Sequence, residues 1–397
     1  MAAIAEEKKD GIGGMMVSFL QGDRMIWMVV IILFIFSMLA VYSATGTLAY
    51  RMQVGNEKYL MKQILMAVSG ILLMFGTHLV DYKYYSRISQ VLWFASIPLL
   101  IYTMAFGTEI NSASRWLTLP GVGLTFQTSD LAKLALIMFL ARQLSLKQDQ
   151  IKDFKEAFIP ILLPIIVTAL LIAPENLSTA AILFFTSVFV MFIGRIAIKH
   201  IALLFGASTI VFGLFFLLLF ALPDSMMVGR MSTWKHRIEN FSENKEDADE
   251  DYQVLQAKIA IAKGGVFNIN PGGSEQRNFL PHPYSDFIYA IIIEEYGLIG
   301  GAFIVLLYLF LLYRCIRIVI KAPKAFGALL AVGLGVALVI QAMINMAVAV
   351  NLVPVTGVTL PLVSMGGSSV IFTSLAFGII LSVSRNIETE EKEAGFA

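Results

Sequence analysis

The residues best suited to catalysis lie in a polar stretch, 272–287, which carries Asp286 near its end and leads into an apolar segment. Basic and hydroxyl side chains, including Arg277 and Ser285, accompany this carboxylate. A carboxylate in front of a helix has an ordinary role as an N-cap, because the first N–H groups and the helix dipole favour negative charge. At the mouth of a helical bundle it can also act as a general base, which would indicate chemistry on a lipid-linked substrate. Both interpretations of Asp286 stay open.

Two further carboxylates, Glu294 and Glu295, follow Asp286 by eight and nine residues. At about 100° per residue they point about 80° and 180° away from it on a helix. They are therefore not expected to form an acid/base pair with Asp286. We predict instead that they face inward and bond to neighbouring helices.

A second polar group opens an earlier apolar segment. Asp130 and Lys133 are three residues apart, share a helix face and are predicted to pair. The ordinary interpretation is an ion pair at the membrane interface. The functional one is that Lys133 faces a cavity and neutralises an anion, together with Arg115 and Gln127 from the preceding connection. Lys and Arg both bind phosphates, and Arg often does so with two N–H groups at once.

A third group lies in an uncharged connection rich in Pro and Gly, 351–369. Non-helical backbone at membrane depth survives only where it is buried in protein or lines a cavity. The N–H groups and hydroxyls where the last apolar segment begins could receive a phosphate, although a glycine-rich helix start is a weak indication alone. The candidate substrate-binding residues added from this connection and from the Asp286 stretch are Pro281, Ser285, Ser364, Gly366, Gly367 and Ser368.

Metal and nucleophile motifs are not evident in the sequence. The four histidines have no ligand spacing, and no phosphate-binding P-loop or serine nucleophile elbow occurs. The lone Cys315 cannot form an internal disulfide, and a net charge of +1 gives no reason to expect a nucleic-acid partner. The histidines are His78, His200, His236 and His282.

The composition predicts the elements that must position these residues. Of 397 residues, 58% are hydrophobic and 14% are charged, whereas globular domains are about 25% charged. Runs of about 20 apolar residues recur, each long enough to cross a bilayer as a helix, and no sustained alternation suggests a β-barrel. We predict an all-α polytopic membrane protein, a single integral membrane domain over 1–397. Its ten expected segments are 25–45, 60–80, 88–106, 129–146, 157–173, 177–193, 198–222, 286–313, 325–350 and 365–385.

The basic residues predict the orientation, because they gather in alternate short loops. Both termini are expected in the cytoplasm, as tails over 1–24 and 386–397, and no removable signal peptide is expected. The longest connection, 223–285, is then a large extracytoplasmic loop between the seventh and eighth helices. Within it, 254–265 could form a short helix lying on the membrane surface or a plain amphipathic connector.

Several of these stretches together resemble the SEDS family, the FtsW/RodA/SpoVE proteins. The most specific matches are to "P-E-x-H-T-D-F-I-F … E-E-x-G-x-x-G" and "P-V-T-G-x-x-L-P-x-x-S-x-G-G-S-S". Others are to "N-x-A-x-R-W … Q-P-S-E-x-x-K", "P-D-x-G-T-A" and "Y-Q … G-G". In the order quoted, the matching residues are 281–300, 354–369, 111–116 with 127–133, 174–180, and 252–253 with 264–265.

The resemblance implies a peptidoglycan glycosyltransferase of the bacterial inner membrane that polymerises lipid II, and it leans toward the division-type FtsW branch. The family's essential Asp falls on Asp286, and its cavity Arg and Lys fall on Arg115 and Lys133. The implied partners are a class B penicillin-binding protein, which is a transpeptidase, and other divisome or elongasome membrane proteins. No cofactor is certain, although a divalent cation, Mg²⁺ or Mn²⁺, could assist.

This sequence departs from the family pattern at several positions. The family's Pro and Glu are here Thr128 and Asp130, and its Glu and His before the essential Asp are His282 and Tyr284. Any role of the family's His is therefore in doubt. Three alternatives stay open: a RodA-type elongation polymerase, a lipid II flippase, which broken helices and buried charges would also suit, and a scaffold that only recruits a transpeptidase.

Overall fold

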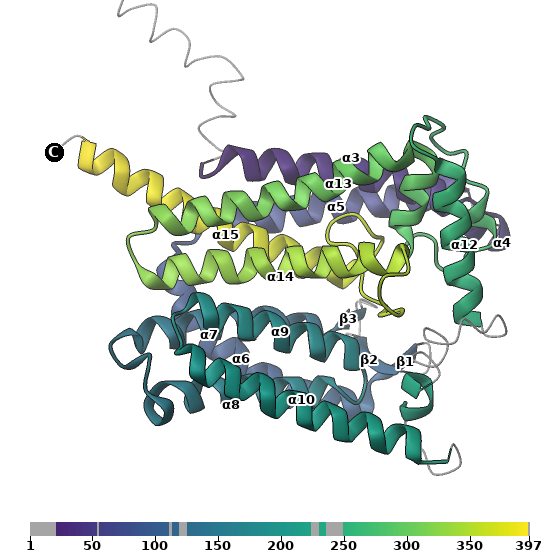
Figure 1. Cartoon of the computed structure of the whole chain (residues 1–397). Helices are drawn as coiled ribbons and strands as arrows, with labels where there is room; N and C mark the ends of the chain where they lie inside the picture. Colours follow the sequence, from purple (N-terminus) through teal and green to yellow (C-terminus); the bar gives the residue numbers. More distant parts are fainter. Residues whose placement is uncertain are drawn as a thin grey trace, which may run out of the picture.

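The computed structural model describes residues 21–53, 55–110, 113–118, 125–223, 230–235 and 249–395. Within them, ten helices run along one common direction and pack side by side (Figure 1). They are α3 Arg24–Ala44, α5 Asn56–Leu79, α6 Tyr82–Phe106, α7 Thr128–Leu146, α8 Ile159–Ile172, α9 Leu177–Ile193, α10 Ile198–Ala221, α13 Ile288–Lys321, α14 Ala325–Ala349 and α15 Gly367–Gly395.

Short elements join these helices. Gly46–Arg51 forms α4, Asp249–Gly264 forms α12, and single turns occupy Gln148–Gln150, Phe154–Phe158 and Gln276–Asn278. Between α6 and α7 lies a three-stranded antiparallel sheet in the order β1-β2-β3. Its pairs include Thr108 with Trp116 and Trp116 with Gln127. The strands are β1 Thr108–Ile110, β2 Ala113–Thr118 and β3 Thr125–Gln127.

The predicted membrane-spanning architecture is confirmed. Eight helices of the described chain are long and apolar enough to cross a bilayer, and α9 is a shorter apolar helix. Two expected ends are wrong: α13 continues to Lys321 rather than 313, and α15 continues to Gly395 rather than 385. Apolar runs stop at the first charges, but helical hydrogen bonding does not, so most of 386–397 extends α15.

Close approaches through glycine pack the inner helices. A Cβ at Gly378 of α15 would lie 1.8 Å from Thr77 Oγ1 of α5, and one at Gly335 of α14 would lie 2.5 Å from Cys315 Sγ of α13. Small residues of this kind let helix backbones approach within a bilayer, where hydrophobic driving force between helices is weak. The helices α7, α14 and α15 form the buried centre, whereas α10 is largely exposed at the periphery.

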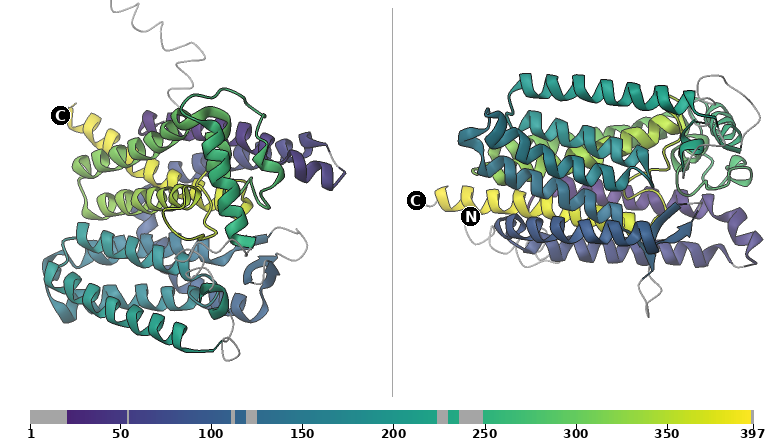
Figure 2. Two further views of the ribbon diagram at one scale, coloured as in Figure 1. Left: turned by 45° about the vertical axis from the view of Figure 1, so that its right-hand side comes forward. Right: turned by 90° about the horizontal axis from the view of Figure 1, so that it is seen from below.

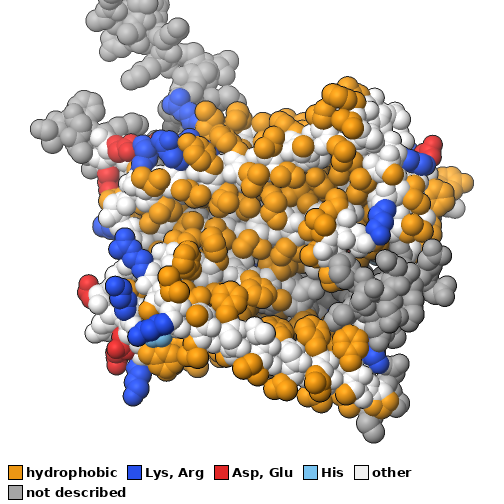
Figure 3. All heavy atoms as spheres, viewed as in Figure 1, with side chains coloured by type: hydrophobic (Ala, Val, Ile, Leu, Met, Phe, Trp, Pro, Cys, Tyr) orange, Lys and Arg blue, Asp and Glu red, His pale blue; other side chains and the backbone are white. Residues whose placement is uncertain are grey.

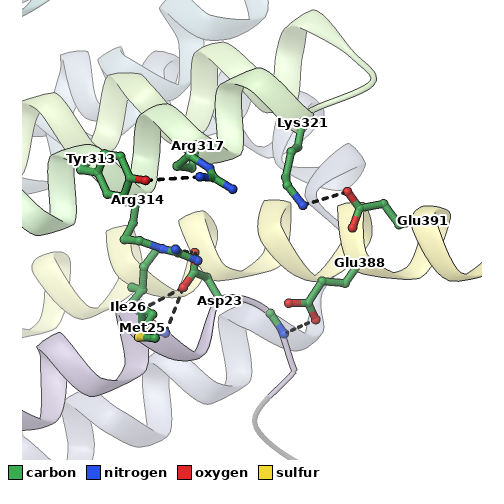
Figure 4. A network of polar contacts seen from close by, with 10 residues as sticks. Asp23, Met25, Ile26, Tyr313, Arg314, Arg317, Lys321, Glu388 and Glu391 are labelled. Carbon is green, nitrogen blue, oxygen red and sulfur yellow. Dashed lines mark hydrogen bonds and ion pairs between the residues drawn. The ribbon is translucent and has the colours of Figure 1, made fainter.

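Charged side chains tie three helices together at the end of the bundle that holds the C-terminus. Asp23 caps α3 by accepting from the N–H groups of its first turn, and it pairs with Arg314 of α13 at 2.6 Å (Figure 4). Lys321 of α13 pairs with Glu391 of α15 at 3.0 Å. Lys and Arg gather over this end in Figure 3. We call it the basic end, and the other the cavity end.

The cavity end carries α12 and the sheet (Figures 1 and 2). Helix α12 lies across the bundle and packs on the start of α13, with Ala257 and Ala260 buried. Of the two alternatives for 254–265, the chain forms a helix, which begins earlier in the sequence, at Asp249. The sheet was not predicted, because strands of three to six residues are too short to show a clear alternation.

Candidate active site

A cavity of about 580 Å³ opens at the cavity end, between the starts of α7 and α15 and the chain around Asp286. The predicted site residues along its wall come from three distant parts of the sequence: Gln127, Asp130, Lys133, Ser285, Asp286, Gly366 and Ser368. Other polar side chains of the wall are Thr179, Arg230, Thr233, Gln253, His282, Tyr284, Gln341, Thr356, Thr359 and Ser369.

The cationic part of the wall comes from the first turns of α7. Lys133 Nζ pairs with Asp130 Oδ1 at 2.8 Å and lies 3.4 Å from Gln341 Oε1 of α14. Ser368 of α15 donates to Asp130 Oδ2 at 3.4 Å. The predicted pairing is therefore confirmed. The Lys133 side chain remains 22% exposed, so its ammonium group can reach a ligand in the cavity.

The carboxylate of Asp286 does not cap α13. That helix begins at Ile288, and its N-cap residue is Phe287, which makes no side-chain cap bond. The N-cap interpretation is therefore wrong, because turns over 283–287 separate the aspartate from the helix. Asp286 Oδ1 instead accepts from Ser285 Oγ at 2.8 Å. A Cβ at Gly357, where φ is +65°, would lie 3.9 Å from Asp286 Oδ2, so the chain there runs close to the carboxylate.

Three consecutive backbone carbonyls hold the Asp286 segment in place. The carbonyl of Tyr284 accepts from the N–H of Met365 at 2.9 Å, and that of Ser285 accepts from Ser364 Oγ at 2.6 Å. The carbonyl of Asp286 accepts from Asn345 Nδ2 at 3.0 Å. We call this set the carbonyl clamp. It joins the segment to α14 and to the connection before α15.

The clamp changes the interpretation of two residues. Ser364 was predicted to bind substrate, but it is 2% exposed and is not among the residues that line the cavity. Asn345 is 1% exposed and also donates to the carbonyl of Val358 at 2.7 Å. Sequence reasoning did not assign Asn345 a role. The available signal was an amide within an otherwise apolar segment, since polar groups there need a partner.

Two helix N-termini meet at the cavity. Helix α15 presents Gly366, Ser368 and Ser369 to it, and α7 begins at Thr128 beside Gln127. The first N–H groups of a helix have no partner within the helix and carry partial positive charge. Together with Lys133 they make this side of the cavity suitable for an anion.

Some predicted residues do not contribute described side chains to the wall. Pro281 is exposed and Gly367 begins α15, and neither lines the cavity. The side chain of Arg115, in β2, lies outside the described part of the chain, as does His236. Between the cavity and α8, Asn176 caps α9 by accepting from Thr179 N–H at 3.1 Å.

The two glutamates of α13 hold the loop before Asp286. Glu294 accepts from the N–H groups of Glu275 and Gln276 at 3.1 and 3.2 Å. It therefore bonds to this loop, whereas we predicted a bond to a neighbouring helix. Glu295 accepts from Ser43 Oγ of α3, which confirms the prediction for this residue. Both are buried away from the cavity.

Sequence reasoning left His282 and Tyr284 without a role, and the structure brings both to the cavity. His282 Nδ1 lies 3.4 Å from Tyr284 Oη. Burial, then the charges of Tyr59 and Asp286, raise the pKa of the Tyr284 phenol above its ordinary value of 10.0, so it stays a neutral donor at physiological pH. Among the described residues no three His, Cys, Asp or Glu side chains group as metal ligands, and we name no metal-ligand set.

Comparisons with known sequences agree with this architecture. The family model described as "Cell cycle protein", for FtsW, RodA and SpoVE, matches residues 23–389. Stage V sporulation protein E of Bacillus subtilis is 34% identical over 373 residues, covering 91% of this chain and 97% of that protein. "Probable peptidoglycan glycosyltransferase FtsW" of Geobacter sp. (strain M18) is 33% identical over 368 residues, covering 91% and 96%.

Solved structures show the same fold. A structure described as "Structural coordination of polymerization and crosslinking by a peptidoglycan synthase complex" matches with a TM-score of 0.72 at 26% identity, covering 92% of this chain and 98% of that one. Thermus thermophilus rod shape determining protein RodA matches with a TM-score of 0.64 at 24% identity, covering 92% and 97%. This chain therefore belongs to the FtsW/RodA/SpoVE family.

Proposed function

We propose that this protein is a peptidoglycan glycosyltransferase that polymerises lipid II into glycan strands. The observation that carries the proposal is one cavity, at one end of a membrane-spanning bundle, that holds both Asp286 and the Lys133 group. A carboxylate and an anion-binding group are the two features that transfer from a diphosphate-linked sugar requires. The names of relatives at 33% identity support the same activity.

In the proposed reaction Asp286 is the general base. Its carboxylate takes the proton from the 4-hydroxyl of the acceptor N-acetylglucosamine, and the oxygen attacks the anomeric carbon of the donor. The new carbon–oxygen bond forms as the bond to the diphosphate breaks, so undecaprenyl diphosphate leaves with the electron pair. Ser285, bonded to Asp286 Oδ1 at 2.8 Å, orients the carboxylate. Positioned proton abstraction contributes about 10²–10⁴-fold to a rate.

The remaining predicted residues serve the diphosphate. Lys133 and Arg115 supply positive charge, and the α15 start at Gly366, Gly367 and Ser368 supplies N–H and hydroxyl donors. Asp130, 2.8 Å from Lys133, fixes the ammonium group in the wall. Gln127 contributes a polar contact, and Pro281 stiffens the chain before the base. A bound Mg²⁺ or Mn²⁺ would supply further charge neutralisation at the diphosphate.

The same proposal includes topology and partners. The basic end of the bundle is cytoplasmic, with both termini there, and the cavity end faces outward in the bacterial inner membrane. The connection 223–285 is then the large extracytoplasmic loop of a single membrane domain. A class B penicillin-binding protein would cross-link the strands. Similarity to FtsW and SpoVE proteins favours the cell-division branch, with other divisome membrane proteins as partners.

Purified protein with its transpeptidase, given lipid II, tests the proposal. We expect glycan strands from the wild type and almost none from Asp286→Ala or Asp286→Asn. Asp153→Asn, which changes an aspartate N-cap far from the cavity residues in sequence, serves as control and should keep wild-type activity. Equal polymer from both Asp286 variants would contradict its role as base. Lipid II crossing liposome membranes without polymer would establish the flippase instead.

A further inference from the structure

Helix α13 is broken near the cavity end, and a loop repairs the break. Gly297 has φ 68° and ψ −179°, which is not helical. The loop that follows α12 takes up backbone groups around it: Leu298 N–H donates to Gly265 O at 2.9 Å, and Asn270 N–H donates to Glu295 O at 2.9 Å. A Cβ at position 297 would lie 2.6 Å from Val266 O. The loop is therefore held against α13 at the level of residues 295–298.

The large apolar side chains of this loop point away from the protein, whereas Asn268 Nδ2 donates to Glu294 O of α13 at 2.7 Å. Val266, Phe267 and Ile269 are 59%, 81% and 86% exposed. They belong to an uncharged run over 266–273. We call these three residues the 266–269 tip. Large apolar side chains this exposed require another apolar phase to cover them.

The length of α13 fixes the depth of the tip in the membrane. Leu298 precedes Arg314, at the basic end, by sixteen residues, which is about 24 Å along a helix. The hydrocarbon core of a bilayer is about 30 Å thick. With Arg314 at one membrane surface, the loop bonded to Leu298 lies within about 6 Å of the opposite hydrocarbon boundary. Its neighbours Leu298 and Ile299 are 47% and 48% exposed on the same membrane-spanning helix.

We propose that the 266–269 tip inserts into the lipid leaflet at the cavity end and anchors the loop there. Lipid is the occupant that the observations favour, because the tip is continuous with the lipid-facing surface of α13 and carries no charge. The anchor would hold α12 and the chain leading to Asp286 at the depth of a lipid headgroup. The inference depends on the membrane-spanning fold and not on the proposed catalytic activity.

Depth-dependent quenching in nanodiscs tests the anchor. A single cysteine at Phe267, in a Cys315→Ala background, is labelled with an environment-sensitive fluorophore. Leu306, which is 61% exposed further along α13, is the control within the membrane. Glu275, on the same loop with a side chain 73% exposed, is the control in water. Quenchers are a lipid with a nitroxide near the headgroup, a lipid with one deep in the acyl chain, and an aqueous ion.

The label at Phe267 is expected to lose most of its fluorescence to the shallow nitroxide and little to the aqueous ion. Leu306 should respond more to the deep nitroxide, and Glu275 to the ion. A Phe267 label quenched like Glu275 would overturn the proposal. Shielding from the aqueous ion only after the transpeptidase is added would assign the tip to a protein interface and would equally overturn it.

Discussion

Replacing Ser364 by alanine separates positioning of the base from binding of the substrate. The change removes a buried hydroxyl that donates to Ser285 O at 2.6 Å and accepts from Leu360 N–H at 2.9 Å. Leaving a buried backbone group unsatisfied costs about 1–3 kcal/mol. If this energy keeps the Asp286 segment in its reacting position, its loss lowers the competent population. At about 1.36 kcal/mol per tenfold, kcat should fall by about 10- to 100-fold.

The assay is the initial rate of lipid II polymerisation against lipid II concentration. We expect KM to stay unchanged, because Ser364 does not line the cavity. Ser382→Ala is the matched control: this serine is also fully buried and donates to a carbonyl, Val80 O, but it lies fifteen residues into α15 from the cavity. It should lose similar thermal stability in detergent and keep its kcat.

A double variant makes the test sharper. If Ser364 acts only through the base, Ser364→Ala combined with Asp286→Ala should be no slower than Asp286→Ala alone, since residues that act as a unit are not additive. A raised KM with unchanged kcat would refute the positioning role and return Ser364 to the substrate-binding residues. So would a double variant slowed by the product of the two single effects.

Three further variants, two of them with a matched comparison, test the anion site, the helix packing and an ion pair. Lys133→Met removes the cation nearest the proposed diphosphate and should lower kcat by about 10²–10³-fold in the same polymerisation assay. Gly264→Ala places a Cβ 2.0 Å from a carbonyl of α13 and should lower the free energy of unfolding by about 1–3 kcal/mol, measured by denaturant titration. Gly206→Ala, in open space on α10, should leave it unchanged. Arg314→Ala leaves the buried carboxylate of Asp23 without its cation. The loss of stability should be somewhat below the about 3–5 kcal/mol of a fully buried pair, because Arg314 is 26% exposed. Lys321→Ala, in a pair about half exposed, should cost at most about 1 kcal/mol, and thermal unfolding in detergent compares the two.

The bundle could be predicted because its helices are apolar over a bilayer thickness. Helix α9 occupies the residues expected, 177–193. The errors, in helix ends and in the missed sheet, arise where burial no longer determines which residue types occur. Helix α15 extends beyond the apolar run through charged residues, among them Glu391, which pairs with Lys321. The sheet was not predicted because its strands pair through backbone hydrogen bonds. In strands this short, the residue types give little indication of such pairing.

Part of the cavity wall could be anticipated from the sequence, but its geometry could not. Ionisable groups such as Asp286 and Lys133 stand out because they are costly near a membrane span. The carbonyl clamp could not be foreseen, since two of its three bonds join residues 79 and 81 positions apart in sequence. All of its acceptors are backbone groups that every residue carries. The sequence likewise shows hydroxyls near Ser364 without showing whether they face the cavity or the protein.

The net charge of the Lys133–Asp130 pair cannot by itself explain how the proposed site binds a diphosphate. Asp130 lies 2.8 Å from Lys133 and compensates its charge, so this pair attracts a diphosphate less strongly than a free ammonium would. The pairing nevertheless holds the ammonium in the cavity wall, 3.4 Å from Gln341 Oε1. The first N–H groups of α7 and α15 carry partial positive charge and add to the attraction that Lys133 and Arg115 supply in the proposed site. Such donors lower the barrier to the extent that they hold the leaving diphosphate more tightly, as it gains charge, than they hold the bound donor.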